Sequence, residues 1–132
     1  MEKAIRELHD RTNPERFRSI IALGEFGEQA LEHLHASLED NDKWVRYFSA
    51  DALGTIGHRS SVDPLIPKLM DEDQDVRWVA ASALGRIGDP RASHALMQAY
   101  NSDNAFVKVF IEEALESLAV TGQTVPQQGT VR

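Results

Sequence analysis

The sequence predicts an all-α fold, an α-solenoid in which about eight helices stack as antiparallel pairs. Three observations predict it. A short motif recurs every 30 or 31 residues, the apolar residues around it have helical rather than strand spacing, and a glycine follows each expected first helix. One helix pair cannot bury its apolar face alone, so several pairs must stack to form a continuous core.

The recurrent motif is Ala-Leu-Gly. Its copies lie at 22–24, 52–54, 83–85 and, with glutamate in place of glycine, 114–116. A second glycine three residues after each of the first three copies is expected to adopt the left-handed conformation that ends a helix. The glycine of the motif itself lies inside the helix, where glycine costs about 0.5–1 kcal/mol relative to alanine. Its recurrence predicts a close approach between successive helices.

Each period is expected to contain two helices. The first is illustrated by residues 43–56, whose apolar positions follow i, i+3, i+4, i+7 spacing after the N-cap candidate Asp42. The second is illustrated by residues 61–71, which contain two prolines. Pro64 is compatible with a first helical turn, whereas Pro67 is expected to kink the helix or delay its start.

The phase of the repeat predicts a single domain over residues 1–120. It is expected to comprise a half unit at 2–10, repeats at about 13–40, 41–71 and 72–102, and a half unit at 103–120. Residues 121–132 are rich in Thr, Gln and Gly and lack periodicity, so we expect a disordered tail there.

The charge, the lack of cysteine and the missing motifs exclude several classes of function. The chain has 14 Lys and Arg against 21 Asp and Glu, a formal net charge of -7, which argues against nucleic acid or an anionic membrane as a partner. The absence of cysteine excludes disulfides and thiol nucleophiles and fits a reducing cytoplasm. No apolar run approaches the roughly 18 residues of a membrane span. No nucleophile elbow or phosphate-binding glycine loop occurs, so we expect no catalytic residues and no cofactor.

One basic residue recurs in each unit, and we call this set the arginine ladder. It consists of Arg16, Arg46, Arg77 and Lys108. Aspartates recur beside it at Asp10, Asp40 and Asp71. We expect a structural role, in which the ladder forms inter-repeat ion pairs and hydrogen bonds to the carbonyls at helix ends.

An aromatic column follows the ladder by one residue. It consists of Phe17, Tyr47 and Trp78, with Val109 in the fourth copy and with Trp44 and Phe106 as neighbours. Two interpretations stay open. The rings either cover the groove between adjacent first helices or form an interaction stripe, because Trp and Tyr are favoured anchors at protein interfaces.

The runs 45–57 and 75–89 resemble the HEAT-like repeat first named from phycobilisome lyase subunits. The resemblance covers roughly residues 2–120 and implies a right-handed α-α superhelix with first helices on the convex face and second helices on the concave face. It implies no single function, because such proteins include binding scaffolds, subunits of bilin lyases and an iron-dependent deoxyhypusine hydroxylase. The repeated His-Glu pairs that the hydroxylase uses for iron are absent here, so we expect no metal site.

The concave face implied by this resemblance supplies the candidate binding residues. They are Glu32, His33, Asp63, Pro67, His94 and Gln98. This mixed, mildly acidic set suits a protein or peptide better than a phosphate backbone, although a merely solvated face would have the same composition.

The sequence thus favours a non-catalytic scaffold that presents a curved helical surface to another protein. The alternative is a subunit of a bilin lyase-like, chromophore-handling complex. The expected last helix is apolar on more than one side, which predicts self-association or docking of another protein through that end.

Overall fold

A computed structural model describes the backbone of residues 1–122 and the side chains of residues 1–120, and within them it contains helices and no strands. The α-helices are α1 (Glu2–His9), α2 (Phe17–Gly24), α3 (Leu31–Ser37), α4 (Lys43–Ile56), α5 (Val62–Leu65), α6 (Gln74–Ile87), α7 (Ser93–Ser102) and α8 (Ala105–Gly122). Short 3-10 segments precede or extend the second helices: η1 (Gly27–Ala30), η2 (Arg59–Ser61), η3 (Ile66–Met70) and η4 (Pro90–Ala92).

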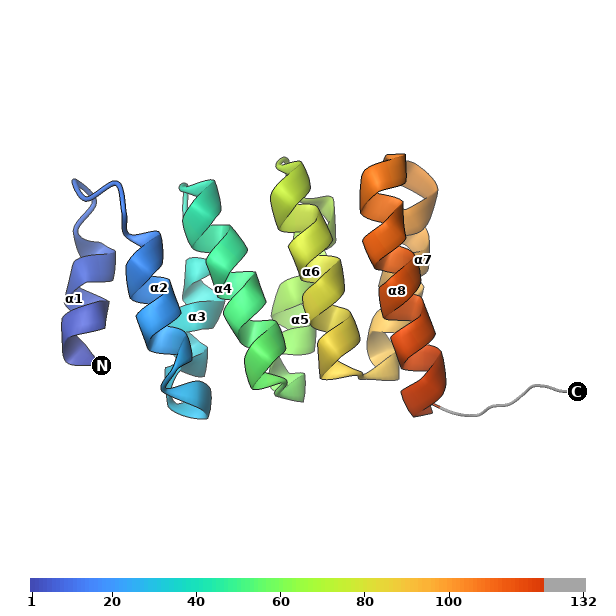
Figure 1. Cartoon of the computed structure of the whole chain (residues 1–132), viewed down its shortest axis with the longest axis horizontal. Coiled ribbons are helices and arrows are strands. Elements are labelled where there is room, and N and C mark those ends of the chain that lie inside the picture. The colour runs from blue at the N-terminus through green and yellow to red at the C-terminus, as the bar shows by residue number, and fades with distance from the viewer. Residues whose placement is uncertain (123–132) are drawn as a thin grey trace, which may run out of the picture.

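The helices form two layers along one axis. The first helices α2, α4, α6 and α8 lie side by side in front, and α3, α5 and α7 lie behind them (Figure 1). The predicted all-α solenoid is confirmed. Helix α8 reaches Gly122 and so includes two residues of the expected tail; residues 123–132 lie outside the described part of the chain.

A single apolar core lies between the two layers. The leucine of each of the first three motifs and one leucine of each second helix are fully buried: Leu23, Leu53, Leu84, Leu34, Leu65 and Leu96. Burying one such side chain contributes about 1.5–3 kcal/mol. Because these leucines recur with the repeat, each helix pair shields the apolar side of its neighbour.

The ends of α4 and α6 follow the predicted capping chemistry. Helix α2 does not, because it ends at Gly24, and Gly27, which has the expected positive φ of 62°, is the first residue of η1. The carboxylates of Asp42 and Asp73 accept hydrogen bonds from backbone N–H groups in the first turns of α4 and α6. Gly57 and Gly88 end these helices with φ of 74° and 78°. At the start of α8 the side chain of Asn104 accepts from the backbone N–H of Val107.

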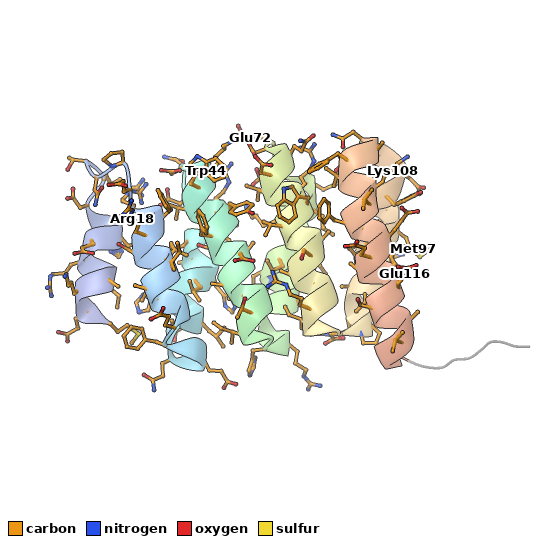
Figure 2. The ribbon with its side chains drawn as sticks, in the orientation of Figure 1. Arg18, Trp44, Glu72, Met97, Lys108 and Glu116 are labelled. Atoms are coloured by element: carbon orange, nitrogen blue, oxygen red, sulfur yellow. The ribbon has the colours of Figure 1, made fainter. Side chains whose placement is uncertain are left out.

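The motif glycine lets successive first helices approach closely. A Cβ on Gly54 would lie 2.8 Å from the Cα of Ala83, and one on Gly85 would lie 2.9 Å from the Cα of Ala114. No side chain fits at such distances. In the fourth copy Glu116 occupies the same position and is exposed on α8 (Figure 2).

The prolines shorten the second helix of the middle repeat. Helix α5 has four residues and continues as the 3-10 segment η3, in which Pro67 is the second residue. Proline has no N–H to donate to the α-helical ladder, so the tighter 3-10 form replaces it. Ile66, the first residue of η3, is partly buried.

Candidate interaction surfaces

The arginine ladder links the loops between helix pairs. Arg46, near the start of α4, donates through Nε and Nη2 to the two carboxylate oxygens of Asp71 at 3.0 and 3.1 Å. Its Nη1 donates to the backbone carbonyl of Asp40 at 2.8 Å. The Arg46 and Asp71 side chains are only 10% and 6% exposed. Such a buried, bidentate pair orients both loops.

The neighbouring arginines repeat this geometry. Arg16 donates to both carboxylate oxygens of Asp40 at 2.9 and 2.8 Å, and Arg77 does the same to Asp103 at 2.9 and 3.2 Å. Asp40 therefore receives Arg16 at its carboxylate and Arg46 at its carbonyl. The hydrogen bond from Arg16 holds the pKa of Asp40 below its ordinary value.

Two expected members of this network lie elsewhere. The ammonium of Lys108 sits 4.9 Å from the centroid of the Tyr100 ring, where it makes a cation–π contact. In the described residues, no aspartate of a following unit lies beside it. Asp10 accepts from the N–H and hydroxyl of Thr12 instead of pairing with Arg16 through a hydrogen bond.

A row of aromatic rings crosses the first-helix layer from α2 to α8. Phe17 stacks on Phe48 with centroids 5.3 Å apart, Tyr47 meets Trp78 edge-on at 5.6 Å, and Trp78 lies 4.5 Å from Phe110. Tyr47 also contacts Phe48 at 5.0 Å, which makes the row continuous. These five residues, which we call the aromatic row, are all half-buried.

The column expected from the sequence is thus only part of the row. Val109 holds the fourth column position, but Phe110, one residue later, contacts Trp78. Trp44 and Phe106 flank the row and are 42% and 49% exposed. Figure 2 places Trp44 near the N-terminal end of α4. The row fills spaces between first helices, and its flanking rings remain accessible.

The same layer is hollowed beside two motif glycines. A groove of about 260 Å³ lies between α2 and α4, and its lining residues are Ile21, Gly24, Glu25, Phe48, Asp51, Ala52 and Thr55. A groove of about 140 Å³ at the equivalent place lies between α6 and α8, lined by Ser82, Gly85, Arg86, Phe110, Glu113, Ala114 and Ser117. We call them the first and third grooves.

The candidate residues of the second-helix layer are mostly exposed and make few contacts. Glu32, Asp63, Pro67, His94 and Gln98 are exposed, and His33 is half-buried. Asp63 has the Nη1 of Arg91 at 4.0 Å, which is an exposed pair of little energetic value. His33 lines a groove of about 270 Å³ between α1 and α3.

A buried polar contact in this layer was not anticipated. The Nε2 of His35 on α3 lies 2.8 Å from the hydroxyl oxygen of Ser61, which is fully buried in the next repeat. Burial, together with the nearby His58, lowers the pKa of His35. Ser61 shares its repeat position with Ala30 and Ala92, and this polar residue in an alanine column is the signal that could have revealed the contact.

The described residues contain no group of three or more His, Cys, Asp or Glu that could hold a metal ion. None of the helices described for this chain is long and apolar enough to cross a membrane.

Comparison with known sequences agrees with this fold. The sequence profile of the family described as HEAT repeats matches residues 1–66 and 31–119. The chain therefore belongs to the HEAT repeat family, as the resemblance predicted. No curated protein matches the chain significantly.

Two solved structures show where similar folds occur. Human deoxyhypusine hydroxylase in complex with glycerol is 29% identical, with a TM-score of 0.78 over 89% of this chain and 42% of that chain. The complex of CpcE and CpcF of phycocyanin lyase from Nostoc sp. gives 28% identity and a TM-score of 0.79, over 90% of this chain and 53% of that chain. This chain thus spans about half of either structure or less.

Proposed function

We propose that this chain is a non-catalytic interaction module that binds another protein through its first-helix layer. The observation that carries the proposal is the pair of accessible rings, Trp44 and Phe106, beside the continuous aromatic row. Ile21 and Val109 in the same layer are also exposed, at 47% and 49%. Aromatic anchors on a rigid surface are the residues that dominate binding energy at protein interfaces.

The second-helix layer is the weaker candidate. Its residues Glu32, His33, Asp63, Pro67, His94 and Gln98 are polar or small, and aromatic anchors are absent from this set. Lys, Glu and Asp are depleted from interface centres, so this composition favours a rim or a solvated surface. Self-association through α8 is a further proposal, supported by the exposed Phe106 and Val109.

The two layers are distinguished by capturing partners from extract of the source cells, in its reducing cytoplasmic fraction, with the tagged chain. A partner is then purified and its affinity measured for Trp44→Ala and for His94→Ala. We expect the first variant to weaken binding by about tenfold or more and the second to leave it unchanged. The opposite pattern would move the binding surface to the second-helix layer.

A bilin lyase-like role is the second candidate, favoured by the similarity to the CpcE–CpcF complex. In that case the chain would work as one subunit beside another HEAT repeat protein that acts on a chromophore or its acceptor. Co-expression with a bilin and a phycocyanin subunit tests this role. Visible absorbance that depends on the chain would favour it over a simple scaffold.

A further inference from the structure

The motif glycines Gly24, Gly54 and Gly85 leave three equivalent recesses, between α2 and α4, α4 and α6, and α6 and α8. A side chain fills the recess between α4 and α6. Arg86 of α6 reaches back onto α4, where Nη2 donates to Asp51 at 3.0 Å and Nη1 donates to the hydroxyl of Thr55 at 3.1 Å. A Cβ on Gly54 would lie 2.6 Å from this Nη2. The recess left by glycine therefore accommodates a guanidinium group.

The first groove has no such filling. Thr55 of α4 holds the repeat position of Arg86, and its short side chain does not reach across to α2. The groove between α2 and α4 consequently retains about 260 Å³. Its floor is the recess at Gly24, where an added Cβ would lie 3.1 Å from that of Ala52.

The walls of the first groove match an arginine side chain. Glu25, the residue that follows α2, and Asp51 on α4 are acidic residues that line the groove, and Ile21 and Phe48 line it with apolar surface for the methylene groups. Asp51 uses Oδ1 to bind Arg86. Among the described residues, no ion pair engages Glu25.

We propose that the first groove binds an arginine side chain presented by the partner protein, in the way that the recess between α4 and α6 binds Arg86. This inference rests on the proposed function and specifies the partner's chemistry on the same layer. The net charge of -7 adds a general attraction for a basic partner.

The third groove serves as an internal comparison. Arg86 holds there the wall position that Glu25 holds in the first groove, and the volume is about 140 Å³. A fixed guanidinium at the wall repels a second one. Arginine binding is therefore expected in the first groove and not in the third.

The experiment uses the full chain and a blocked Gly-Arg-Gly peptide, with a Gly-citrulline-Gly peptide as its uncharged match. Backbone amide shifts are followed by NMR during titration. The arginine peptide is expected to shift the amides of Gly24, Glu25, Ala52 and Thr55, and Glu25→Gln is expected to weaken its binding about fivefold. The citrulline peptide should bind more weakly by a similar factor.

A second variant supplies the missing side chain from within. Thr55→Arg should place a guanidinium in the first groove and abolish peptide binding. Thr55→Ala, which removes a hydroxyl that accepts from Arg86 and donates to the backbone carbonyl of Asp51 but adds no charge, should retain it. Circular dichroism verifies that each variant folds. Equal binding of the two peptides, or undiminished binding to folded Thr55→Arg, overturns the proposal. Such a result would not change the partner affinities measured for the wild type and Trp44→Ala. Failure of the arginine proposal is therefore distinguishable from failure of the proposed function.

Discussion

The guanidinium of Arg46 donates hydrogen bonds to both carboxylate oxygens of Asp71, 25 residues further along the chain. The same guanidinium donates to the carbonyl of Asp40, and Arg77 donates to the carbonyl of Asp71 at 2.9 Å. The loop that contains Asp40 is therefore held by Arg16 and Arg46, and the loop that contains Asp71 is held by Arg46 and Arg77. In each loop one arginine binds the aspartate carboxylate and the other binds the aspartate backbone carbonyl. The spacing of successive helix pairs is fixed by this chain of contacts as well as by the core.

Replacing Arg46 is expected to destabilise the fold strongly. Arg46→Ala leaves the nearly buried Asp71 carboxylate without its ion-pair partner, and such a loss costs about 3–5 kcal/mol. Urea denaturation followed by circular dichroism measures the change. Arg18→Ala is the matched control, because Arg18 pairs with Glu15 and both side chains are exposed, at 70% and 54%, where a pair is worth about 0–1 kcal/mol. Equal losses for the two variants would contradict this role of the ladder.

Acid is expected to weaken the ladder through Asp40. Its pKa is lower in the folded chain than its ordinary value of 3.8, because Arg16 donates hydrogen bonds to the carboxylate. The stabilisation is fully present above that ordinary value and is lost as the pH falls through the folded-state pKa. Unfolding free energies between about pH 6 and about pH 3 should decline less steeply for Asp40→Asn than for the wild type. Equal pH dependence of the unfolding free energy in the two proteins would show that Asp40 does not contribute to the loss of stability in acid.

A second pH dependence is expected at milder acidity from His35. Its folded-state pKa is lowered from the ordinary 6.5 by burial and by His58, so the unfolded chain binds this proton first. Stability is therefore retained above the ordinary value and falls as the pH drops from it towards the folded-state pKa. NMR titration of the imidazoles should show His35 titrating below 6.5. His35→Gln should flatten the decline, and an unchanged slope would contradict the assignment.

The motif glycines are expected to differ in their tolerance of alanine. Gly54→Ala places a Cβ 2.8 Å from the Cα of Ala83 and against Arg86, and such overpacking costs about 1–3 kcal/mol. At Gly24 the added Cβ would lie 3.1 Å from another Cβ, a contact that a small shift relieves. Gly24→Ala should be close to neutral, because Gly24 is the last residue of α2 and the shift needed to accommodate the methyl group is small. Thermal unfolding of both variants checks this order.

Local features of the fold could be predicted because each depends on one residue and its nearest backbone. Asp42 and Asp73 cap α4 and α6, and Gly57 ends α4 in the left-handed conformation, as their positions before and after the periodic segments indicated. Asp103, which also precedes a periodic segment, has another role. Its carboxylate pairs with Arg77, so Asn104 caps α8 instead.

The candidate surfaces were less predictable, because they depend on contacts between repeats. The reach of Arg86 into the recess at Gly54 requires the actual separation of α4 and α6. The contact between His35 and Ser61 likewise joins two repeats. A column of equivalent residues shows which positions face the neighbouring repeat, but it does not show which side chain crosses the gap.

Glu116 sets a limit on the array itself. Each earlier position of this column holds glycine, and the neighbouring first helix comes so near that even a methyl group would collide with it at Gly54 or Gly85. A further first helix stacked on α8 in the same register would meet the glutamate side chain. A protein that covers the outer side of this helix must do so at a wider spacing or another crossing angle.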